Sequence, residues 1–308
     1  MNQLRDLMQQ LLACGCACSA EEPMSRHTSF RIGGPADLFV TVHDEAQLCN
    51  CLRLCREREI PYFLLGNGSN LLVSDDGVAG VVIQLGGSFC EVRCVEGNTL
   101  ICGAGAKLTA VCLAALHNDL SGMEFAYGIP GTVGGAVYMN AGAYGGEIKQ
   151  VFSGCRCMDA CGNVVTLSAQ ELQLGYRSSI LQQTHGIVTE VTLTLSVGDA
   201  AQIKAQMDDL VQRRRDKQPL EFPSAGSTFK RPEGHFAGAL IEQAGLKGYA
   251  VADAQVSEKH AGFVINRGNA TCADVVQLVS EVQQKVLAQS GVILQPEICL
   301  IGRNASWN

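Results

Sequence analysis

Three short polar segments, far apart in the chain, contain residue types that could carry out chemistry together. Arg177 could bind a carboxylate through two parallel hydrogen bonds. Ser227, on a glycine-containing turn, could hand over a proton, and Glu297 could bind or orient a polarised oxygen. Each also has a structural interpretation: a surface ion pair for Arg177, a turn cap for Ser227 and an exposed strand-end charge for Glu297. The residues alone leave both interpretations open.

The histidines and cysteines offer no comparable set. No Ser-His-Asp or Cys-His arrangement can be singled out among the six histidines, and His260 is interpreted as structural. None of the fifteen cysteines has the C-x-x-C spacing of a zinc knuckle or redox pair. We interpret most of them as small buried hydrophobic residues in free thiol form, and predict no metal. A metal or redox site in the cluster Cys14, Cys16 and Cys18 stays open as an alternative.

A glycine-rich stretch at residues 125–147 is the feature around which the chain is organised. It contains seven glycines and no lysine or arginine. Glycine serves where the main chain takes a positive φ or comes into contact with a ligand, so the stretch predicts a binding surface made of backbone, stiffened at Pro130. A flexible linker is the alternative, but aromatic and branched residues are spread through the stretch, whereas linkers combine glycine with serine.

A second glycine-containing turn, Gly66-Asn67-Gly68-Ser69-Asn70, follows a short apolar strand. Successive main-chain N–H groups in such a turn can form a nest that binds one anion. The turn is not a Walker loop, because no Gly-Lys-Ser/Thr follows. An ordinary turn remains an equal alternative.

The elements that must position these residues alternate in an α+β order. After a first helix within residues 1–12, a strand at 37–42, a helix capped by Asp44 and a strand at 62–65 predict a βαβ unit. Further strands are expected at 81–85, 92–95, 99–104, 151–158, 164–167, 187–197, around 250 and at 263–266, and helices at 107–118, 200–215, 236–244 and from 271 onward. No G-x-G-x-x-G opens a helix, which disfavours a Rossmann domain.

Composition excludes several classes of protein. The chain has 308 residues, 47% of them hydrophobic, and can bury a sizeable core. A formal net charge of −7 argues against nucleic-acid binding, which needs clustered basic residues. No apolar run is long enough to span a membrane, and the first residues lack the apolar region of a signal peptide. We expect a cytoplasmic protein with no membrane partner.

Eight segments in order along the chain resemble the UDP-N-acetylenolpyruvoylglucosamine reductase family, flavoenzymes that make UDP-N-acetylmuramate for peptidoglycan. They are residues 28–36, 65–72, 128–147, 176–177, 224–232, 244–248, 256–266 and 296–302. The resemblance implies an FAD-binding region of the vanillyl-alcohol-oxidase (PCMH) type with two α+β subdomains, and an α+β substrate-binding domain. The implied limits are 1–205 for the FAD-binding region, divided into about 1–85 and 86–205, then 206–290 for the UDP-sugar domain and 291–308 for a segment returning to the FAD-binding region.

The resemblance also implies a reaction and its residues. NADPH would reduce a noncovalently bound FAD and leave, and the enolpyruvyl ether of UDP-N-acetylglucosamine would then accept hydride at its methylene carbon. Arg177 and Glu297 would stabilise the enol-like charge, and Ser227 would protonate the adjacent carbon. FAD contacts are implied for Arg31, Gly66, Asn67, Gly68, Ser69, Asn70, Gly128, Ile129, Pro130, Gly131, Thr132, Gly135, Asn140 and Gly142, and substrate contacts for Tyr176, Lys230 and Arg231.

The chain departs from the family pattern at two positions and in one loop. Gln295 stands where a second glutamate is common, and Arg231 where asparagine is common, so Arg231 adds a fork that can bind a phosphate. The chain between Tyr176 and Ser224 is short, so it resembles the branch that lacks an extra tyrosine-bearing loop.

Two other functions fit parts of this pattern. One is a flavin-binding or UDP-sugar-binding module without turnover, against which the joint presence of Arg177, Ser227 and Glu297 argues. The other is a flavin oxidase of the same fold, disfavoured because no His or Cys stands at a matching flavin-attachment position, although His27 stays open. The expected partners are small molecules, NADPH and the enolpyruvyl substrate, and the expected state is a monomer or weak oligomer.

Overall fold

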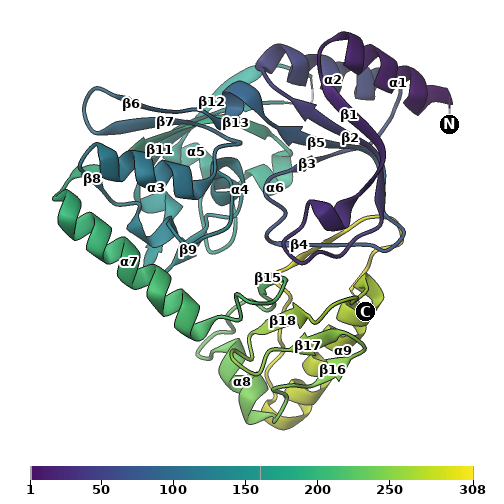
Figure 1. Ribbon diagram of the computed structural model, residues 1–308, viewed down its shortest axis with the longest axis vertical. Coiled ribbons are helices and arrows are strands. Elements are labelled where there is room, and N and C mark those ends of the chain that lie inside the picture. The colour runs from purple at the N-terminus through teal and green to yellow at the C-terminus, as the bar shows by residue number, and fades with distance from the viewer. Residues whose placement is uncertain (1, 160, 308) are drawn as a thin grey trace. The chain divides into compact units, whose positions relative to one another are not determined.

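The computed structural model describes residues 2–159 and 161–307, which form two compact units of mixed helix and strand (Figure 1). Unit 1 comprises the residues up to Ser19, Leu38–Asn67 and Gly80–Arg213. Unit 2 comprises Ala20–Asp37, Gly68–Ala79 and the chain from Arg214 onward. Each unit is therefore assembled from three separate segments of the sequence.

One sheet, with most of its residues in unit 1, has the strand order β1-β2-β5-β3. These strands are β1 (Ala17–Pro23), β2 (Pro35–Val42), β5 (Val78–Leu85) and β3 (Tyr62–Leu65), accompanied by helices α1 (Asn2–Ala13) and α2 (Glu45–Glu57). The carboxylate of Asp44 accepts a hydrogen bond from the Gln47 N–H, which confirms the predicted cap of α2. The two strands of the predicted βαβ unit, β2 and β3, are not neighbours, because β5 lies between them and pairs in parallel with β3.

The second sheet of unit 1 is antiparallel and has the order β12-β11-β13-β7-β6. Its strands are β6 (Val92–Val95), β7 (Thr99–Gly103), β11 (Phe152–Met158), β12 (Val164–Ser168) and β13 (Ile187–Thr194). The predicted strand 187–197 is wrong at its end, since β13 stops at Thr194 and a separate β14 (Ser196–Val197) pairs with β8 (Leu120–Ser121).

The unit also contains α3 (Leu108–His117), α4 (Val133–Tyr138), α5 (Ala169–Leu172), α6 (Leu181–Thr184) and the hairpin strands β9 (Gly142–Ala143) and β10 (Gly146–Glu147). Fully buried Leu100, Val111 and Val191 mark the core between α3 and this sheet.

Helix α7 (Ala200–Lys217) carries the chain from unit 1 into unit 2. Unit 2 has a four-stranded sheet in the order β15-β18-β17-β16, with β15 (Ser224–Ser227), β16 (Ala250–Val251), β17 (Ala254–Val256) and β18 (Phe263–Asn266). Helices α8 (Ala237–Gln243) and α9 (Cys272–Ser290) complete it. Thr271 and Asp274 form the capping box predicted at the start of α9. The apolar stripe of α9 is fully buried, at Val275, Leu278, Val279, Val282 and Val286.

Early segments of the chain complete unit 2. Strand β4 (Leu71–Val73) pairs in parallel with β19 (Cys299–Ile301). The Asp75 carboxylate accepts hydrogen bonds from the N–H groups of Cys272 (2.8 Å) and Ala273 (3.0 Å), at the first turn of α9. The Ser29 hydroxyl donates to the Ser224 carbonyl at 2.7 Å. These contacts fix the segments that carry Arg31 and Asn70 to the same unit as Ser227 and Glu297.

Over the described ranges, no helix combines the length and the apolar character needed to cross a bilayer.

Candidate active site

Two segments predicted to contact FAD meet within unit 1. The side-chain amide of Asn67 donates to the Pro130 carbonyl at 2.9 Å. A Cβ atom on Gly66 would lie 2.9 Å from the hydroxyl oxygen of Thr132. That hydroxyl accepts from the Gly135 N–H at 3.3 Å and caps α4. The end of β3 and the start of α4 therefore present adjoining backbone, as a shared ligand surface requires.

The glycines of the stretch 125–147 do not all serve the same purpose. Gly134 is required by its own chain, because a Cβ there would lie 2.9 Å from the Ala104 Cβ, and Gly146 would similarly collide with the Phe125 ring. Gly131 and Gly135 have no positive φ, and the nearest neighbours of an added Cβ lie at 3.4 and 3.3 Å. Glycine inside a helix is unfavourable by about 1 kcal/mol relative to alanine. A Cβ on Gly135 would make a tight contact with the Thr132 hydroxyl, but not one as severe as those at Gly134 and Gly146, so a role of Gly135 in letting a flat cofactor approach is compatible with the fold.

The remaining predicted FAD contacts lie in different settings. Gly128 and Ile129 are half-buried in unit 1. Gly68, Ser69 and Asn70 belong to unit 2, where Gly68 has φ +60° and its Cα faces the His27 carbonyl so closely that a Cβ would clash at 2.0 Å. Arg31, also in unit 2, is exposed and has φ +56°. The structure therefore distributes the predicted contacts over both units.

Arg177 stands on a tight turn of unit 1. Gly175 and Ser178 pair across the turn, with N–H to carbonyl distances of 3.0 and 3.3 Å, and Arg177 between them has φ +54°. A positive φ at this turn position usually selects glycine or asparagine, so an arginine here is strained. Its guanidinium donates to the Gly142 carbonyl at 3.4 Å and lies 5.4 Å from the ring centre of Tyr176, which is 58% exposed.

Asn140 is buried and directs its side chain into unit 1. Its amide nitrogen donates to the Glu147 carboxylate (2.8 Å) and to the Gly175 carbonyl (2.9 Å), and its oxygen accepts from the Lys149 N–H (3.0 Å). These bonds join the β9–β10 hairpin to the turn that carries Arg177. A direct contact of Asn140 with FAD stays a prediction.

Ser227 and Glu297 lie together in unit 2. Ser227 ends β15 after Gly226, which has φ +80°, and pairs with Phe263 of β18. The Glu297 N–H donates to the carbonyl of Thr228 at 2.8 Å, and the Glu297 carbonyl accepts from the Asn70 side chain at 3.2 Å. The backbone of Glu297 is therefore held on both sides next to the residue that follows Ser227. Ser227 is exposed and Glu297 half-buried, so both are accessible to a ligand.

Lys230 and Arg231 line a cavity of about 380 Å³ in unit 2. The Lys230 N–H donates to the Gln295 carbonyl at 2.8 Å, so Gln295 contacts Lys230 through its backbone and not through its side chain. The Arg231 guanidinium lies 4.0 Å from the ring centre of Phe236, which is 62% exposed. The other lining residues are Pro232, Glu233, His235, Val292, Ile293 and Gln295. Of these, Glu233, His235, Val292 and Ile293 were not predicted, although closeness in sequence to Lys230 and Gln295 could have indicated them.

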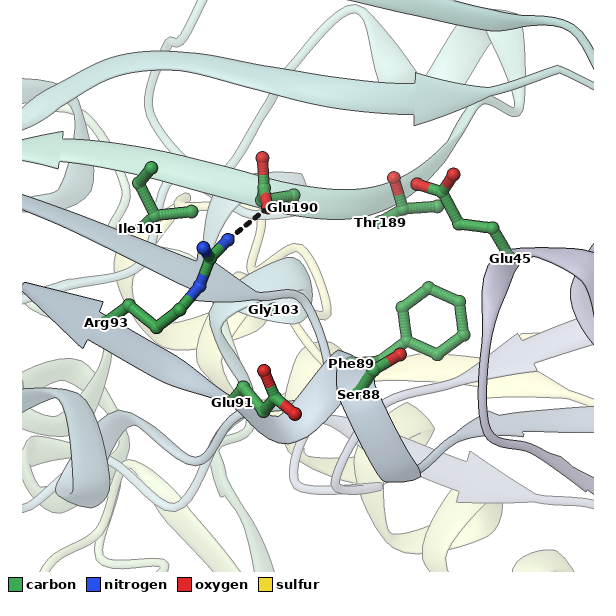
Figure 2. Close-up of a pocket in the computed structure, with 9 residues that line it drawn as sticks. All are labelled: Glu45, Ser88, Phe89, Glu91, Arg93, Ile101, Gly103, Thr189 and Glu190. Carbon is green, nitrogen blue, oxygen red and sulfur yellow. Dashed lines mark hydrogen bonds and ion pairs between the residues drawn. The ribbon is translucent and has the colours of Figure 1, made fainter. Parts of the chain in front are cut away.

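A second cavity, of about 160 Å³, lies in unit 1 and contains none of the predicted site residues (Figure 2). Glu45, Glu91 and Glu190 line it, together with Arg93, whose guanidinium points toward Glu190 and lies 3.4 Å from it (Figure 2). Nothing at this acidic cluster indicates a ligand.

The cysteines are free thiols, and the described residues contain no group of His, Cys, Asp and Glu that could hold a metal ion. Cys16 is buried, Cys14 is exposed and Cys18 lies between them in exposure. Burial raises the pKa of Cys18 to about 11, which disfavours the thiolate needed for metal or redox chemistry.

Comparison with known proteins identifies the family. Residues 36–168 match the model of an FAD binding domain, and residues 218–301 match the C-terminal domain of UDP-N-acetylenolpyruvoylglucosamine reductase. The reductase of Clostridium perfringens is 52% identical over 286 residues, 93% of each chain, and that of Clostridium botulinum is 50% identical over 304 residues, 98% of this chain and 99% of the relative.

The crystal structure of UDP-N-acetylenolpyruvylglucosamine reductase from Thermus caldophilus matches with a TM-score of 0.79 and 36% identity, covering 92% of this chain and 98% of that one. These matches confirm the predicted α+β architecture, an FAD-binding domain of the vanillyl-alcohol-oxidase type followed by a reductase C-terminal domain. This chain therefore belongs to the UDP-N-acetylenolpyruvoylglucosamine reductase family, and it is an oxidoreductase.

Proposed function

We propose that this enzyme reduces UDP-N-acetylglucosamine enolpyruvate to UDP-N-acetylmuramate in peptidoglycan synthesis, with NADPH as hydride donor and FAD as noncovalent cofactor. The observation that carries this proposal is the 50–52% identity with named reductases over at least 93% of the chain. The presence of Arg177, Ser227 and Glu297 on defined turns and strands supports it.

Backbone in unit 1 would hold the cofactor. Gly131 and Gly135, which carry no side chain, would let a flat ring approach the main chain, and Asn67 keeps the turn after β3 against Pro130. FAD, when bound there, supplies a carrier that accepts hydride and passes it on. Main-chain amides can interact with its phosphates without adding a mobile charge.

Arg177, Glu297 and Ser227 would act on the substrate. The Arg177 guanidinium can bind the enolpyruvyl carboxylate through its planar fork and stabilise the charge that develops as hydride arrives at the methylene carbon. Glu297 would share in stabilising that charge, in a protonated form, and Ser227 would deliver a proton to the adjacent carbon. The backbone bonds of Glu297 to Thr228 and Asn70 would keep its position fixed.

The UDP portion would bind through Lys230 and Arg231, with Tyr176 as a further contact. Both cations line the unit 2 cavity, where Arg231 can bind a phosphate through two hydrogen bonds. Gln295 contacts Lys230 through its backbone carbonyl, so replacing the family's glutamate there should change the reaction little. The domain limits 1–205, 206–290 and 291–308 and the branch without a tyrosine-bearing loop remain part of this proposal.

One spectroscopic experiment tests the function. The purified protein should be yellow, its flavin absorbance should bleach with NADPH in the absence of oxygen, and colour should return on adding the enolpyruvyl substrate. A protein that binds flavin without bleaching would be a binding module. Rapid return of colour with oxygen alone, and none with the substrate, would identify an oxidase.

We also propose that the enzyme works in the cytoplasm as a monomer or weak oligomer. Its two substrates, NADPH and a nucleotide sugar, are cytoplasmic metabolites, which supports the location. Sedimentation of the holoenzyme at micromolar concentration should give the mass of one chain, or a dimer that dissociates on dilution.

A further inference from the structure

Asn140 connects two loops of unit 1 from a buried position. Its side chain is 1% exposed, and its backbone has φ +41°, which asparagine tolerates better than most residues. Both hydrogens of its amide have acceptors, one on Glu147 and one on the Gly175 carbonyl, and its oxygen has a donor in the Lys149 N–H. The hairpin of β9 and β10 and the turn of Arg177 therefore share one buried anchor.

Glu147 is held firmly by this anchor and by its neighbours. Oε2 accepts from Asn140 at 2.8 Å, and Oε1 lies 2.8 Å from the Lys149 ammonium. Its side chain also accepts from the Gln150 N–H in a capping box. The hydrogen bond from Lys149 lowers the pKa of the Glu147 carboxyl, with further lowering from Asn140 and from the positive charge of Arg177. The Glu147 carboxylate is thus held by Asn140 and Lys149, on the same hairpin whose Gly142 carbonyl accepts a hydrogen bond from Arg177.

Contacts within unit 1 hold both the backbone and the guanidinium of Arg177. The turn is closed by the pair of bonds between Gly175 and Ser178, and Gln182 donates to the Arg177 carbonyl at 3.1 Å. The guanidinium has a 3.4 Å bond to the Gly142 carbonyl, at the long end of the hydrogen-bond range. Gly142 pairs with Glu147 across the hairpin, so the carboxylate lies on the strand opposite this carbonyl.

From this arrangement we propose that Glu147, fixed by Asn140, is a positioning residue that orients the Arg177 guanidinium for the substrate carboxylate. This inference rests on the proposed reductase function. Lys149 contributes to this arrangement because its ammonium occupies one oxygen of Glu147. That ion pair weakens the attraction between Glu147 and the Arg177 guanidinium. Glu147 can then orient Arg177 without competing strongly against the substrate carboxylate.

Glu147→Gln removes the charge with little change of shape. Reoxidation of the reduced enzyme by the enolpyruvyl substrate should slow by about tenfold, less than the roughly hundredfold that a 1 Å misplacement can cost, while reduction by NADPH should change by less than about twofold. Glu147→Asp should recover part of the loss. Combining Glu147→Gln with Arg177→Lys should slow reoxidation by about as much as Arg177→Lys alone, because both changes remove one interaction.

A matched control separates this effect from general loss of charge. Glu45 is a carboxylate of unit 1 that lies 3.0 Å from Arg156, away from the hairpin sequence. Glu45→Gln should leave both half-reactions at wild-type rates. Lys149→Met should have the opposite effect on Arg177, because Glu147, without its ion pair to Lys149, should bind the guanidinium more strongly. The KM for the enolpyruvyl substrate should therefore rise severalfold.

Chemical labelling gives a readout that does not depend on turnover. In the FAD-free protein, phenylglyoxal should modify Arg177 severalfold faster in Glu147→Gln and more slowly in Lys149→Met than in the wild type, as measured by mass spectrometry of the peptides. Unchanged labelling in both variants, wild-type reoxidation in Glu147→Gln, or additive effects in the double variant would each overturn the inference. If the wild type fails to react with NADPH or the enolpyruvyl substrate, the proposed function fails, whereas the labelling still tests the link between Glu147 and Arg177.

Discussion

At the scale of single residues, the candidate site contains side chains on backbone conformations that their residue types do not favour. Arg177 has φ +54° on a turn that normally selects glycine or asparagine, and Arg31 has φ +56°. Such conformations cost about 1–3 kcal/mol each and persist where the surroundings enforce them, often at active sites. The residue types of Arg177, Ser227 and Glu297 could be chosen from the sequence, but their strain could not, because φ depends on hydrogen bonds such as those between Gly175 and Ser178.

Ser227→Ala should separate the two half-reactions. The serine is proposed to act only when the substrate carbon receives its proton, so flavin reduction by NADPH should stay almost unchanged. Reoxidation by the enolpyruvyl substrate should slow by at least about a hundredfold, the lower end of what a positioned acid contributes. Stopped-flow absorbance measures both steps.

Two further variants examine the same chemistry. Ser227→Cys should recover part of the lost rate, because a thiol can still donate a proton. Arg177→Lys should keep only a small part of the wild-type reoxidation rate, since an ammonium cannot replace a planar guanidinium. Wild-type reoxidation in Ser227→Ala, or equal slowing of both half-reactions, would show that Ser227 is not the proton donor.

At the scale of elements, capped and periodic segments could be predicted, whereas short or glycine-rich ones could not. The helices after Asp44 and Thr271 were identified by their caps, which the structure confirms. Helix α4 was missed because Gly134 and Gly135 hide its pattern, and β1 was missed because ACSAEEP is too polar to look like a strand. Strands β4 and β19 have only three residues each, and their pairing is a tertiary fact that local sequence does not contain.

The neighbouring glycines of α4 should respond differently to substitution. Gly134→Ala should destabilise the FAD-free protein by about 1–3 kcal/mol, since its Cβ would press against Ala104. Gly135→Ala should change stability by less than about 1 kcal/mol, because better helix propensity offsets a 3.3 Å contact with Thr132. Its FAD affinity should nevertheless fall at least about tenfold, because the methyl group would occupy the face proposed for the cofactor.

Bulkier substitutions extend this comparison. Gly131→Val and Gly135→Val should lose FAD, through occupied space rather than a forbidden φ, because neither glycine has a positive φ. Flavin content of purified protein and denaturant titration of the FAD-free form give the two quantities. Stoichiometric flavin in both valine variants would rule out this cofactor surface.

Asp75→Ala should weaken unit 2 from a distant part of the sequence. The variant leaves the N–H groups of Cys272 and Ala273 without their acceptor at the start of α9. A lost N-terminal cap costs about 1 kcal/mol, so the free energy of unfolding obtained from urea titration should fall by that amount. Asp76→Ala, which removes an exposed bond to Asn304, should shift it by less than about 0.5 kcal/mol. Equal shifts would contradict a capping role for Asp75.

At the scale of the whole molecule, each unit buries apolar residues drawn from separate chain segments. Leu72 and Phe30 pack in the core of unit 2 with residues of α9, more than 200 positions later. A sequence read in order suggests domains that follow one another, and it cannot show that an early segment completes a late one. The matched FAD-binding and C-terminal models nevertheless confirm the predicted architecture.

Thiol reactivity should follow the two cores. Burial raises the pKa of Cys102, Cys112 and Cys272 to about 12, so these thiols stay protonated and shielded at pH 8. Brief alkylation of the native protein should modify the four exposed cysteines, Cys14, Cys90, Cys94 and Cys161. Full alkylation after denaturation should reach all fifteen. Several stable disulfides or a bound zinc ion in the mass spectrum would contradict the assignment of free thiols.

The pairing of β4 with β19 also sets the order in which the newly made chain can fold. Val73 pairs with Ile301, more than 200 positions later in the chain. At a synthesis rate of about 5–20 residues per second, β4 emerges roughly 10–50 s before its partner exists. During that interval the apolar side chain of Leu72, fully buried in the finished protein, has no core to enter. Until β19 has been made, the growing chain therefore exposes apolar surface that favours aggregation.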